Sequence, residues 1–358
     1  MSVDRPLPDA DSTPAAQVVR RPAGPLVLGG DLGGTSTRII VADSSGTVVG
    51  RGAAAGGNPT SHPASAAANF AQALHAALTG LDPTEVKAAV VGMAGGVALA
   101  RPDVAAQFEA AWTGAGLTVA PGYIGDLEVA FASGTPEPDG TVLIAGTGSN
   151  AGLVRNHQLV RTAGGHGWLL GDDGSGFWLG REAVRSVLQA LDLREPLGLL
   201  GQAVVQAILP DRDNNATAHR EGYDALRDDL VRTVNSRPPV LLAELAPVVI
   251  TAYAQDDETA RTLVKRAAEL LTETAARLKT TSDKGPMVLA GSVAGESSPV
   301  GQLIRRHFAG EVLTARDGVG GATWLALGAL DPALATAQTH QRLVSTQSKT
   351  EAGRTSTA

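Results

Sequence analysis

Two short glycine turns, each placed between two runs of β-branched and aliphatic residues, constrain the fold of this chain most. The first lies in LVLGGDLGGTSTRIIVADSSGTVVG (residues 26–50), and the second lies in VLIAGTGSNAGLV (residues 142–154). Apolar runs that are joined by such short turns predict antiparallel strands. We therefore expect two strand-rich units, each of which begins with a glycine hairpin.

The same order of elements follows each hairpin. In the first unit, we expect three strands within residues 25–54, a helix at 63–78, a strand at 86–96, a helix at 102–116 and a strand at 118–126. The second unit has three strands at 141–146, 150–155 and 158–164, then a long stretch with apolar residues at i, i+3 and i+4, a strand at 286–295, and a strand, turn and helix over 311–330. A β-β-β-α-β-α-β pattern that occurs twice indicates an α/β protein of two domains with mixed sheets, the second domain carrying a helical insertion.

Composition excludes several classes of protein. The formal charge of −7 on 358 residues gives no reason to expect nucleic acid or an anionic membrane as a partner. Since there are no cysteines, disulfides, iron–sulfur clusters and thiolate zinc sites are excluded, and the seven histidines form no HExxH motif. No apolar run has the length of a membrane helix, and the N-terminal residues lack the apolar core of a signal peptide. We therefore expect a cytoplasmic protein.

Three glycine turns at strand ends are candidates for binding an anion: Asp31–Thr35, Gly146–Asn150 and Gly291–Ser292. One such turn alone is most often an ordinary tight turn. Glycines also let backbone amides approach a phosphate, and nearby hydroxyls add donors, so two turns that face each other from two domains would hold a phosphate chain. The chain has no Gly-Lys dipeptide and hence no P-loop, and GTGSNAG opens a hairpin, unlike the dinucleotide fingerprint that opens a helix.

The motifs GGDLGGTSTR, GTGSN and GGHGWLLGDDGSGFWLG, in this order, resemble those of the N-acetylglucosamine kinase family over roughly residues 25–330. That family belongs to the acetate-and-sugar-kinase, Hsp70 and actin fold, which also contains the ATPase activators of 2-hydroxyacyl-CoA dehydratases. Those activators need cysteines for their cluster, and this chain has none. The resemblance implies two actin-like (ribonuclease-H-like) domains with an interdomain cleft.

The resemblance also implies domain boundaries. The first domain would comprise residues 25–125 and a returning helix at about 318–335, and the second would comprise residues 126–317. The polar composition of residues 1–24 and 338–358 predicts disordered tails.

Carried over by position, the resemblance implies a role for each motif residue. Asp31 would hold the Mg²⁺ of MgATP. Gly33, Gly34, Thr35 and, from the other domain, Thr147 would contact the phosphates, and Gly291 and Ser292 would border the adenosine. The residues that match the amino-sugar pocket are Asn58, Asp126, Ser149, Asn150, Gly165, His166, Gly167 and Asp172.

Asp126 is the candidate general base, since it lies where a strand ends and a helix begins. An Asp at such a position is also a common helix N-cap, and the sequence alone does not separate the two roles. In a kinase, Asp126 would accept the proton of the attacking sugar hydroxyl. Phosphoryl transfer has a loose transition state, so a carboxylate of ordinary basicity within hydrogen-bond reach is adequate.

The resemblance favours transfer of phosphate from ATP to the 6-hydroxyl of N-acetylglucosamine, and glucosamine remains the alternative substrate. A nucleotide-gated regulatory ATPase with a protein partner is the alternative of another class. A glycosidase that uses Asp172 and Asp173 is disfavoured, because adjacent carboxylates rarely face one sugar from two sides. Apolar helices at 196–210 and 239–254 could form a homodimer contact, and the sequence gives Asp256–Asp257 no role.

Overall fold

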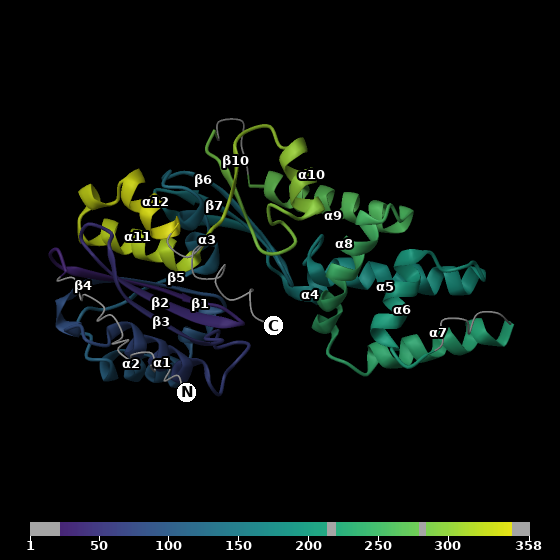
Figure 1. Ribbon diagram of the computed structural model, residues 1–358, viewed down its shortest axis with the longest axis horizontal. Coiled ribbons are helices and arrows are strands. Elements are labelled where there is room, and N and C mark those ends of the chain that lie inside the picture. Colours follow the sequence, from purple (N-terminus) through teal and green to yellow (C-terminus); the bar gives the residue numbers. More distant parts are fainter. Residues whose placement is uncertain (1–21, 213–219, 279–283, 346–358) are drawn as a thin grey trace, which may run out of the picture.

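The computed structural model describes residues 22–212, 220–278 and 284–345, and in these residues it forms two five-stranded mixed sheets covered by helices (Figure 1). In the first sheet the strand order is β3-β2-β1-β4-β5. The hairpins β1–β2 and β2–β3 are antiparallel, whereas β4 and β5 run parallel to β1. The strands are β1 (Leu26–Leu32), β2 (Ser36–Asp43), β3 (Val48–Ala55), β4 (Val86–Met93) and β5 (Gly122–Gly125).

The second sheet repeats this order. It runs β8-β7-β6-β9-β10, so that its three antiparallel strands and two parallel strands occupy the same places as those of the first sheet. Its strands are β6 (Gly140–Ala145), β7 (Ser149–Arg155), β8 (Gln158–Gly164), β9 (Met287–Ala290) and β10 (Val312–Thr314). The predicted repeat of one α/β unit is therefore confirmed.

Two helices cover the outer face of the first sheet, α1 (Ala66–Leu78) and α2 (Pro102–Gly114). Phe70 of α1 contacts Phe108 and Trp112 of α2, with ring centroids 5.6 and 6.1 Å away. The 3-10 turns η1 (Pro83–Glu85) and η2 (Gly96–Ala100) flank β4. These aromatic rings fill the centre of a core that is otherwise built from aliphatic side chains.

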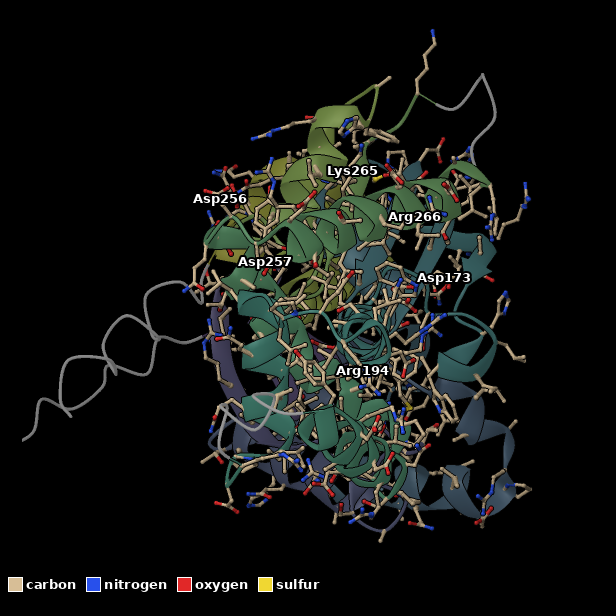
Figure 2. The ribbon with its side chains drawn as sticks, turned by 90° about the vertical axis from the view of Figure 1, so that its right-hand side faces the viewer. Asp173, Arg194, Asp256, Asp257, Lys265 and Arg266 are labelled. Atoms are coloured by element: carbon tan, nitrogen blue, oxygen red, sulfur yellow. The ribbon has the colours of Figure 1, made fainter. Side chains whose placement is uncertain are left out.

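Most of the chain between β8 and β9 is helical, and α5, α6 and α7 extend away from both sheets (Figure 1). Asp257 connects two of these helices, because its carboxylate accepts hydrogen bonds from Ala260 N at the start of α9 and from Leu200 N at the start of α6. Figure 2 shows Asp256 beside it, with an exposed side chain. Asp257 thus caps a helix. The helices are α4 (Gly167–Leu170), α5 (Gly176–Leu193), α6 (Leu199–Ile208), α7 (Arg220–Asn235), η4 (Pro239–Leu245), α8 (Ala246–Ala254), α9 (Glu258–Ala276) and, after β9, α10 (Pro299–His307).

Two helices lie between the sheets, α3 (Asp126–Gly134) and α11 (Gly318–Leu330). Although α11 follows the last strand of the second sheet, it packs on β1 and β4 of the first sheet and on α3. Close packing requires small residues here: a Cβ on Gly29 would lie 2.1 Å from Thr323 Oγ1, and one on Gly321 would lie 2.6 Å from Ser133 N. The elements that carry Asp31 and Asp126, β1 and α3, therefore both pack on α11.

One prediction about the C-terminal end is wrong. Residues 338–358 were expected to form a disordered tail, but α12 (Ala337–Ser345) follows the turn η5 (Pro332–Leu334) and packs on α11. Leu343 and Val344 are buried, and His340 Nε2 lies 2.7 Å from the carbonyl of Ala132 in α3. These contacts supply the apolar burial that the polar composition did not suggest. The rest of the predicted tails, residues 1–21 and 346–358, lies outside the described residues.

No helix within the described ranges is long and apolar enough to cross a bilayer.

Candidate active site

Asp31 and Arg38 form an ion pair at the end of the first hairpin. The register of β1 and β2 places them directly opposite each other, and Arg38 Nη2 lies 2.6 Å from Asp31 Oδ2. The side chain of Arg38 is 36% exposed and that of Asp31 is 22% exposed, so solvent reaches both. The carboxylate predicted to hold a metal is therefore paired with a cation of its own chain.

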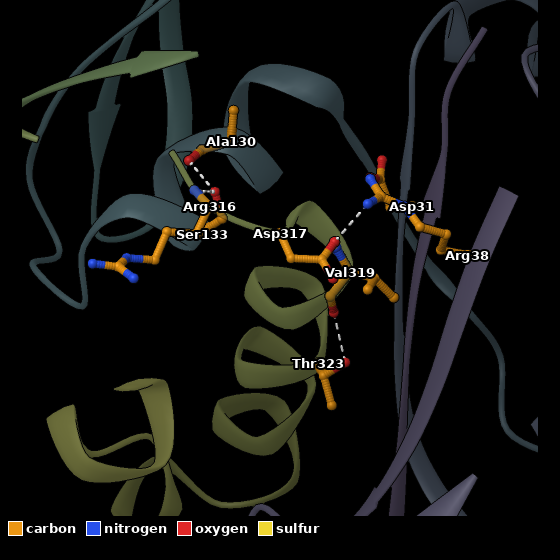
Figure 3. A network of polar contacts seen from close by, with 8 residues as sticks. All are labelled: Asp31, Arg38, Ala130, Ser133, Arg316, Asp317, Val319 and Thr323. Carbon is orange, nitrogen blue, oxygen red and sulfur yellow. Dashed lines mark hydrogen bonds and ion pairs between the residues drawn. The ribbon is translucent and has the colours of Figure 1, made fainter. Parts of the chain in front are cut away.

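The same guanidinium binds a second carboxylate from the other end of the sequence. Arg38 Nη1 lies 3.0 Å from Oδ1 of Asp317, the N-cap of α11 (Figure 3). Asp317 is only 7% exposed, and its Oδ2 is buried without a hydrogen-bond partner. Burial raises the pKa of Asp317, while the charge of Arg38 opposes this rise.

Asp126 is the first residue of α3 and directly follows β5. Its Oδ1 accepts a 2.9 Å hydrogen bond from Leu127 N. The side chain reaches solvent, yet protein surrounds it on several sides, and this desolvation raises the pKa of Asp126. The carboxylates of Asp31 and Glu128 raise it further. Asp126 thus lies close enough to Asp31 for the two charges to interact.

Residues of the loop after β3 contact the turn between β1 and β2, and the tip of this turn is exposed. The carbonyl of Gly33 accepts hydrogen bonds from Gly57 N and Asn58 N, both at 3.1 Å, and His62 Nε2 lies 2.5 Å from the carbonyl of Gly34. Gly34 and Thr35 are exposed, and a Cβ on Gly34 would meet no other atom. The amides and hydroxyl at this tip can therefore reach a ligand.

Asn58, a predicted sugar contact, organises its own loop. Its Oδ1 accepts hydrogen bonds from Thr60 N at 2.8 Å and from Ser61 N at 3.3 Å. Its amide nitrogen has no hydrogen-bond partner among the described residues, and Asn58 is partly exposed, so this donor can serve a ligand.

The corresponding turn of the second sheet is held by the loop at residues 171–175 and by the start of α5. Asp172 Oδ1 accepts from Ser149 N, the Ser149 hydroxyl donates to the carbonyl of Asp173, and Phe177 N donates to the carbonyl of Thr147, each at 3.0 Å. Gly148 is needed here, because a Cβ would lie 2.8 Å from Asp172 Oδ1. The Ser149 hydroxyl is thus used within the protein, whereas Thr147 is exposed.

Gly291 and Ser292 lie next to this second turn. Gly291 has a φ of +86°, and a Cβ on it would lie 2.4 Å from the carbonyl of Ala145, directly before the turn. Val293 N and Ala294 N donate to that same carbonyl. The structure therefore brings two of the three predicted glycine turns into contact.

The segment Gly165–Gly167 is exposed and lies beside Asn150. Gly165 has a φ of +68°, and a Cβ on it would lie 2.8 Å from the side-chain amide of Asn150. Asn150 Oδ1 is buried without a hydrogen-bond partner. His166 precedes the short helix α4, and its side chain faces solvent. Asn150 and this segment can together contact a polar ligand.

The predicted residues therefore fall into two groups. One, around Asp31 and Asp126, lies where α3 and α11 meet the first sheet; the other, around Ser149, Asp172 and Gly291, lies at the end of the second sheet. Sequence reasoning missed Arg38 and Asp317. Arg38 stands within the motif GGDLGGTSTR, and the hairpin register could have placed it opposite Asp31.

The donor set at Asp31 suits a magnesium ion that arrives with a nucleotide. Among the described residues there is no group of three or more His, Asp or Glu side chains that could hold a metal by themselves. Magnesium, however, commonly uses one or two carboxylates, keeps several waters and takes phosphate oxygens. Asp31 and the unpartnered Oδ2 of Asp317 are oxygen ligands of this kind.

Two sheets of one topology, joined by α3 and α11 and carrying glycine turns at equivalent ends, define an α/β ATPase fold of the actin type. Residues 28–326 match the sequence profile of the BadF/BadG/BcrA/BcrD ATPase family, and the chain belongs to that family.

The similar proteins include sugar kinases. An N-acetylmuramic acid/N-acetylglucosamine kinase of Clostridium acetobutylicum is 26% identical over 156 residues, which are 42% of this chain and 47% of that protein. The match thus spans about half the length of the curated relative. A crystal structure from Chromobacterium violaceum, provisionally assigned as an N-acetylglucosamine kinase, aligns with a TM-score of 0.64 at 24% identity and covers 86% of this chain and 100% of the other.

A ROK family glucokinase from Streptomyces griseus, solved with glucose and AMPPNP, aligns with a TM-score of 0.50 at 20% identity and covers 84% of this chain and 99% of the other. At these identities, both structural matches support the fold.

Proposed function

We propose that this protein is an ATP-dependent sugar kinase that transfers the γ-phosphate to the 6-hydroxyl of N-acetylglucosamine. The position of Asp126 carries the proposal: an accessible carboxylate begins α3 beside Asp31, where the helices between the sheets meet the first glycine hairpin. The named activity of the Clostridium relative supports the choice of an amino sugar.

In this proposal, the exposed tips of the two hairpins bind the phosphate chain. Gly33 N donates to the carbonyl of Ser36 and so shapes the turn, and the backbone amides of Gly34 and Thr35 would donate to the phosphate oxygens. The hydroxyls of Thr35 and Thr147 would add donors. Gly291 and Ser292 would border the adenosine. Asp31 would hold a magnesium ion, which would neutralise phosphate charge.

The sugar would lie between Asp126 and the second hairpin. Asp126 would accept the proton of the 6-hydroxyl, while the amides of Asn58 and Asn150 would bind other polar groups of the ring. The remaining contacts of the proposed pocket would come from Ser149, Gly165, His166, Gly167 and Asp172. Since the transition state is loose, these residues would act mainly by positioning and by excluding water.

A coupled assay of ADP release, run with N-acetylglucosamine, glucosamine, glucose, N-acetylmannosamine and N-acetylmuramic acid, tests this proposal. We expect N-acetylglucosamine to stimulate ADP release most. In the nuclear magnetic resonance spectrum of the product, coupling between phosphorus and the C6 protons should identify the 6-phosphate. Stimulation by glucosamine alone would change the substrate and keep the chemistry. ADP release that no sugar increases would contradict the kinase and favour a regulatory ATPase.

Three further expectations stay predictions. They are the cytoplasmic location, the domain boundaries, and a homodimer through the apolar segments at 196–210 and 239–254.

A further inference from the structure

We propose that Arg38 occupies the place of a divalent cation between Asp31 and Asp317, and that a metal ion must displace it to bind there. The inference depends on only one part of the proposed function, the metal site at Asp31. It assigns a positioning role to Arg38, which the sequence analysis had given none.

The geometry supports this role directly. One planar guanidinium bridges two carboxylates that come from opposite ends of the chain, at 2.6 Å to Asp31 and 3.0 Å to Asp317 (Figure 3). Bridging two carboxylates is also how a divalent cation would bind here. Through Asp31 Oδ2 and Asp317 Oδ1, Arg38 therefore pairs with the two carboxylates that a metal would need.

The pairing is incomplete in charge and in hydrogen bonds. Three carboxylates, those of Asp31, Asp317 and the nearby Asp126, face the two guanidinium groups of Arg38 and Arg51, so one negative charge remains. Arg38 Nε and Asp317 Oδ2 are both buried without a hydrogen-bond partner. A divalent ion would balance the two carboxylates fully, so it can compete with the single charge of Arg38.

The side chain of Arg38 can move toward solvent, and a second arginine can partly balance the charge of Asp317. Its side chain is 36% exposed, and Arg51 on the adjacent strand β3 lies close enough to Asp317 to interact with its charge. Asp317 therefore keeps a cation nearby when Arg38 leaves.

The displacement would act on the connection between the two sheets. Asp317 lies in the segment that leads from β10 of the second sheet to α11 on the first. Its neighbour Arg316 donates its backbone N–H to Ser133 Oγ of α3 at 3.1 Å, and that hydroxyl donates to the carbonyl of Ala130 (Figure 3). The connection is thus fixed on one side by α3 and on the other by Arg38. Metal binding would release the second of these contacts.

Thermal unfolding and Mn²⁺ binding, measured without nucleotide or sugar, test the inference. In Arg38→Met the two carboxylates face each other without their bridging cation. We expect a lower Tm than in the wild type, and we expect millimolar Mg²⁺ or Mn²⁺ to raise that Tm by at least about 2 °C more than it raises the wild-type Tm. Mn²⁺ titration followed by electron paramagnetic resonance should show affinity at least about tenfold above that of the wild type.

Matched variants separate a metal site from general destabilisation. Arg101→Met removes an exposed ion pair with Asp103, 2.7 Å long, and should leave the metal response at the wild-type level. Arg38→Met combined with Asp317→Asn should lose the extra response. Potassium chloride at equal ionic strength should not replace the divalent ion.

The inference is overturned if Arg38→Met and the wild type bind Mn²⁺ equally, or if the lower Tm of the variant does not respond to the metal. If Arg38→Met does not fold, Arg38→Lys tests the inference in its place, because an ammonium group lacks the planar fork that bridges both carboxylates. Arg38→Lys must then bind Mn²⁺ at least about threefold more tightly than the wild type. Since neither ATP nor sugar is present, a failed kinase assay and a failed metal response are independent results.

Discussion

Asp126 is the residue on which the proposed chemistry depends, and its surroundings determine how it responds to pH. Desolvation raises its pKa above that of an ordinary aspartate, and the charges of Asp31 and Glu128 act in the same direction. The hydrogen bond from Leu127 N opposes them. A carboxylate with a raised pKa is a somewhat stronger base toward the hydroxyl proton.

Replacing Asp126 with Asn should lower kcat by about 10²-fold or more and leave sugar binding largely intact, because the amide cannot accept the hydroxyl proton. In the wild type, kcat should fall as the pH decreases through the raised pKa of Asp126, so the acid limb should lie above that of an ordinary aspartate. Steady-state kinetics over a pH series, with sugar affinity measured separately by calorimetry, checks both expectations.

The matched control is Asp103→Asn, which changes an exposed aspartate at the start of α2 and should leave kcat unchanged. A near-normal kcat in Asp126→Asn would remove Asp126 from the proposed chemistry.

For single residues, the sequence could predict features that adjacent parts of the chain determine. The place of Asp126 at the junction of a strand and a helix was predicted from the local sequence and is confirmed, while its role as a base stays a prediction. The bridge that Arg38 forms between Asp31 and Asp317 depends on α11 returning to the first sheet, which brings distant parts of the chain together. No local pattern contains that contact, and the ion pairs of Arg38 were therefore missed.

At the scale of elements, the turn between β6 and β7 contains the residues GTGSN for structural as well as chemical reasons. Gly148 lies against the carboxylate of Asp172. The backbone of Asp172 has a left-handed φ of +57°. An aspartate tolerates this conformation better than most residues, but at some cost in strain. The turn and the loop at residues 171–175 thus hold each other in place, which keeps the exposed Thr147 at a fixed position.

Gly148→Ala should break this arrangement. Its Cβ would lie 2.8 Å from Asp172 Oδ1 and 3.0 Å from Asp172 Cγ, so the carboxylate would have to leave Ser149 N. We expect a loss of about 1–3 kcal/mol in the free energy of unfolding, measured with urea. Gly146→Ala in the same turn is the control, since a Cβ there meets no atom within 4 Å. Equal stability of the two variants would show that Asp172 does not hold the turn.

The elements that the sequence predicted well are those with a strong period of apolar residues. The three strands of each hairpin unit and helices such as α1 and α2 lie close to their expected places. Helix α12 was missed because it buries only three side chains, His340, Leu343 and Val344, among polar residues. Helix α10 was missed although Pro299 begins it and basic residues end it, a typical helix pattern. Helix α12 depends on neighbours that the sequence does not reveal, whereas the local pattern of α10 could have predicted that helix.

At the scale of the whole molecule, Trp324 of α11 joins three parts of the fold. Its ring is contacted edge-on by His157 from the turn between β7 and β8 and by His340 from α12, with centroids 5.1 and 5.2 Å away. His340 also reaches the carbonyl of Ala132 in α3. The second sheet, the helices between the sheets and the C-terminal helix therefore meet at one aromatic cluster, formed by Trp324, His157 and His340.

This cluster should make the stability of the protein depend on pH. Burial lowers the pKa of His340, and the nearby charges of Arg316 and His157 lower it further, whereas the contact with the carbonyl of Ala132 opposes this. Burial also lowers the pKa of His157, against the opposing charges of Asp139 and Glu137. Because the unfolded chain binds protons near pH 6.5 and the folded chain resists them, the unfolded state gains protons first as the pH falls. The stability that these neutral histidines support is thus present above about pH 6.5 and decreases as the pH falls toward their lowered pKa values.

Urea unfolding at a series of pH values between 7.5 and 5 should show this decrease, and His340→Gln should make it shallower by up to about 1.4 kcal/mol per pH unit, the largest contribution that one proton can make. His75→Gln is the matched control, because His75 is exposed on α1 and its loss should leave the slope unchanged. If His340→Gln and the wild type lose stability with the same slope, the buried His340 does not link the packing around Trp324 to pH. A shallower slope in His340→Gln alone would locate the pH dependence at the junction of the two sheets, where α3, α11 and α12 pack together.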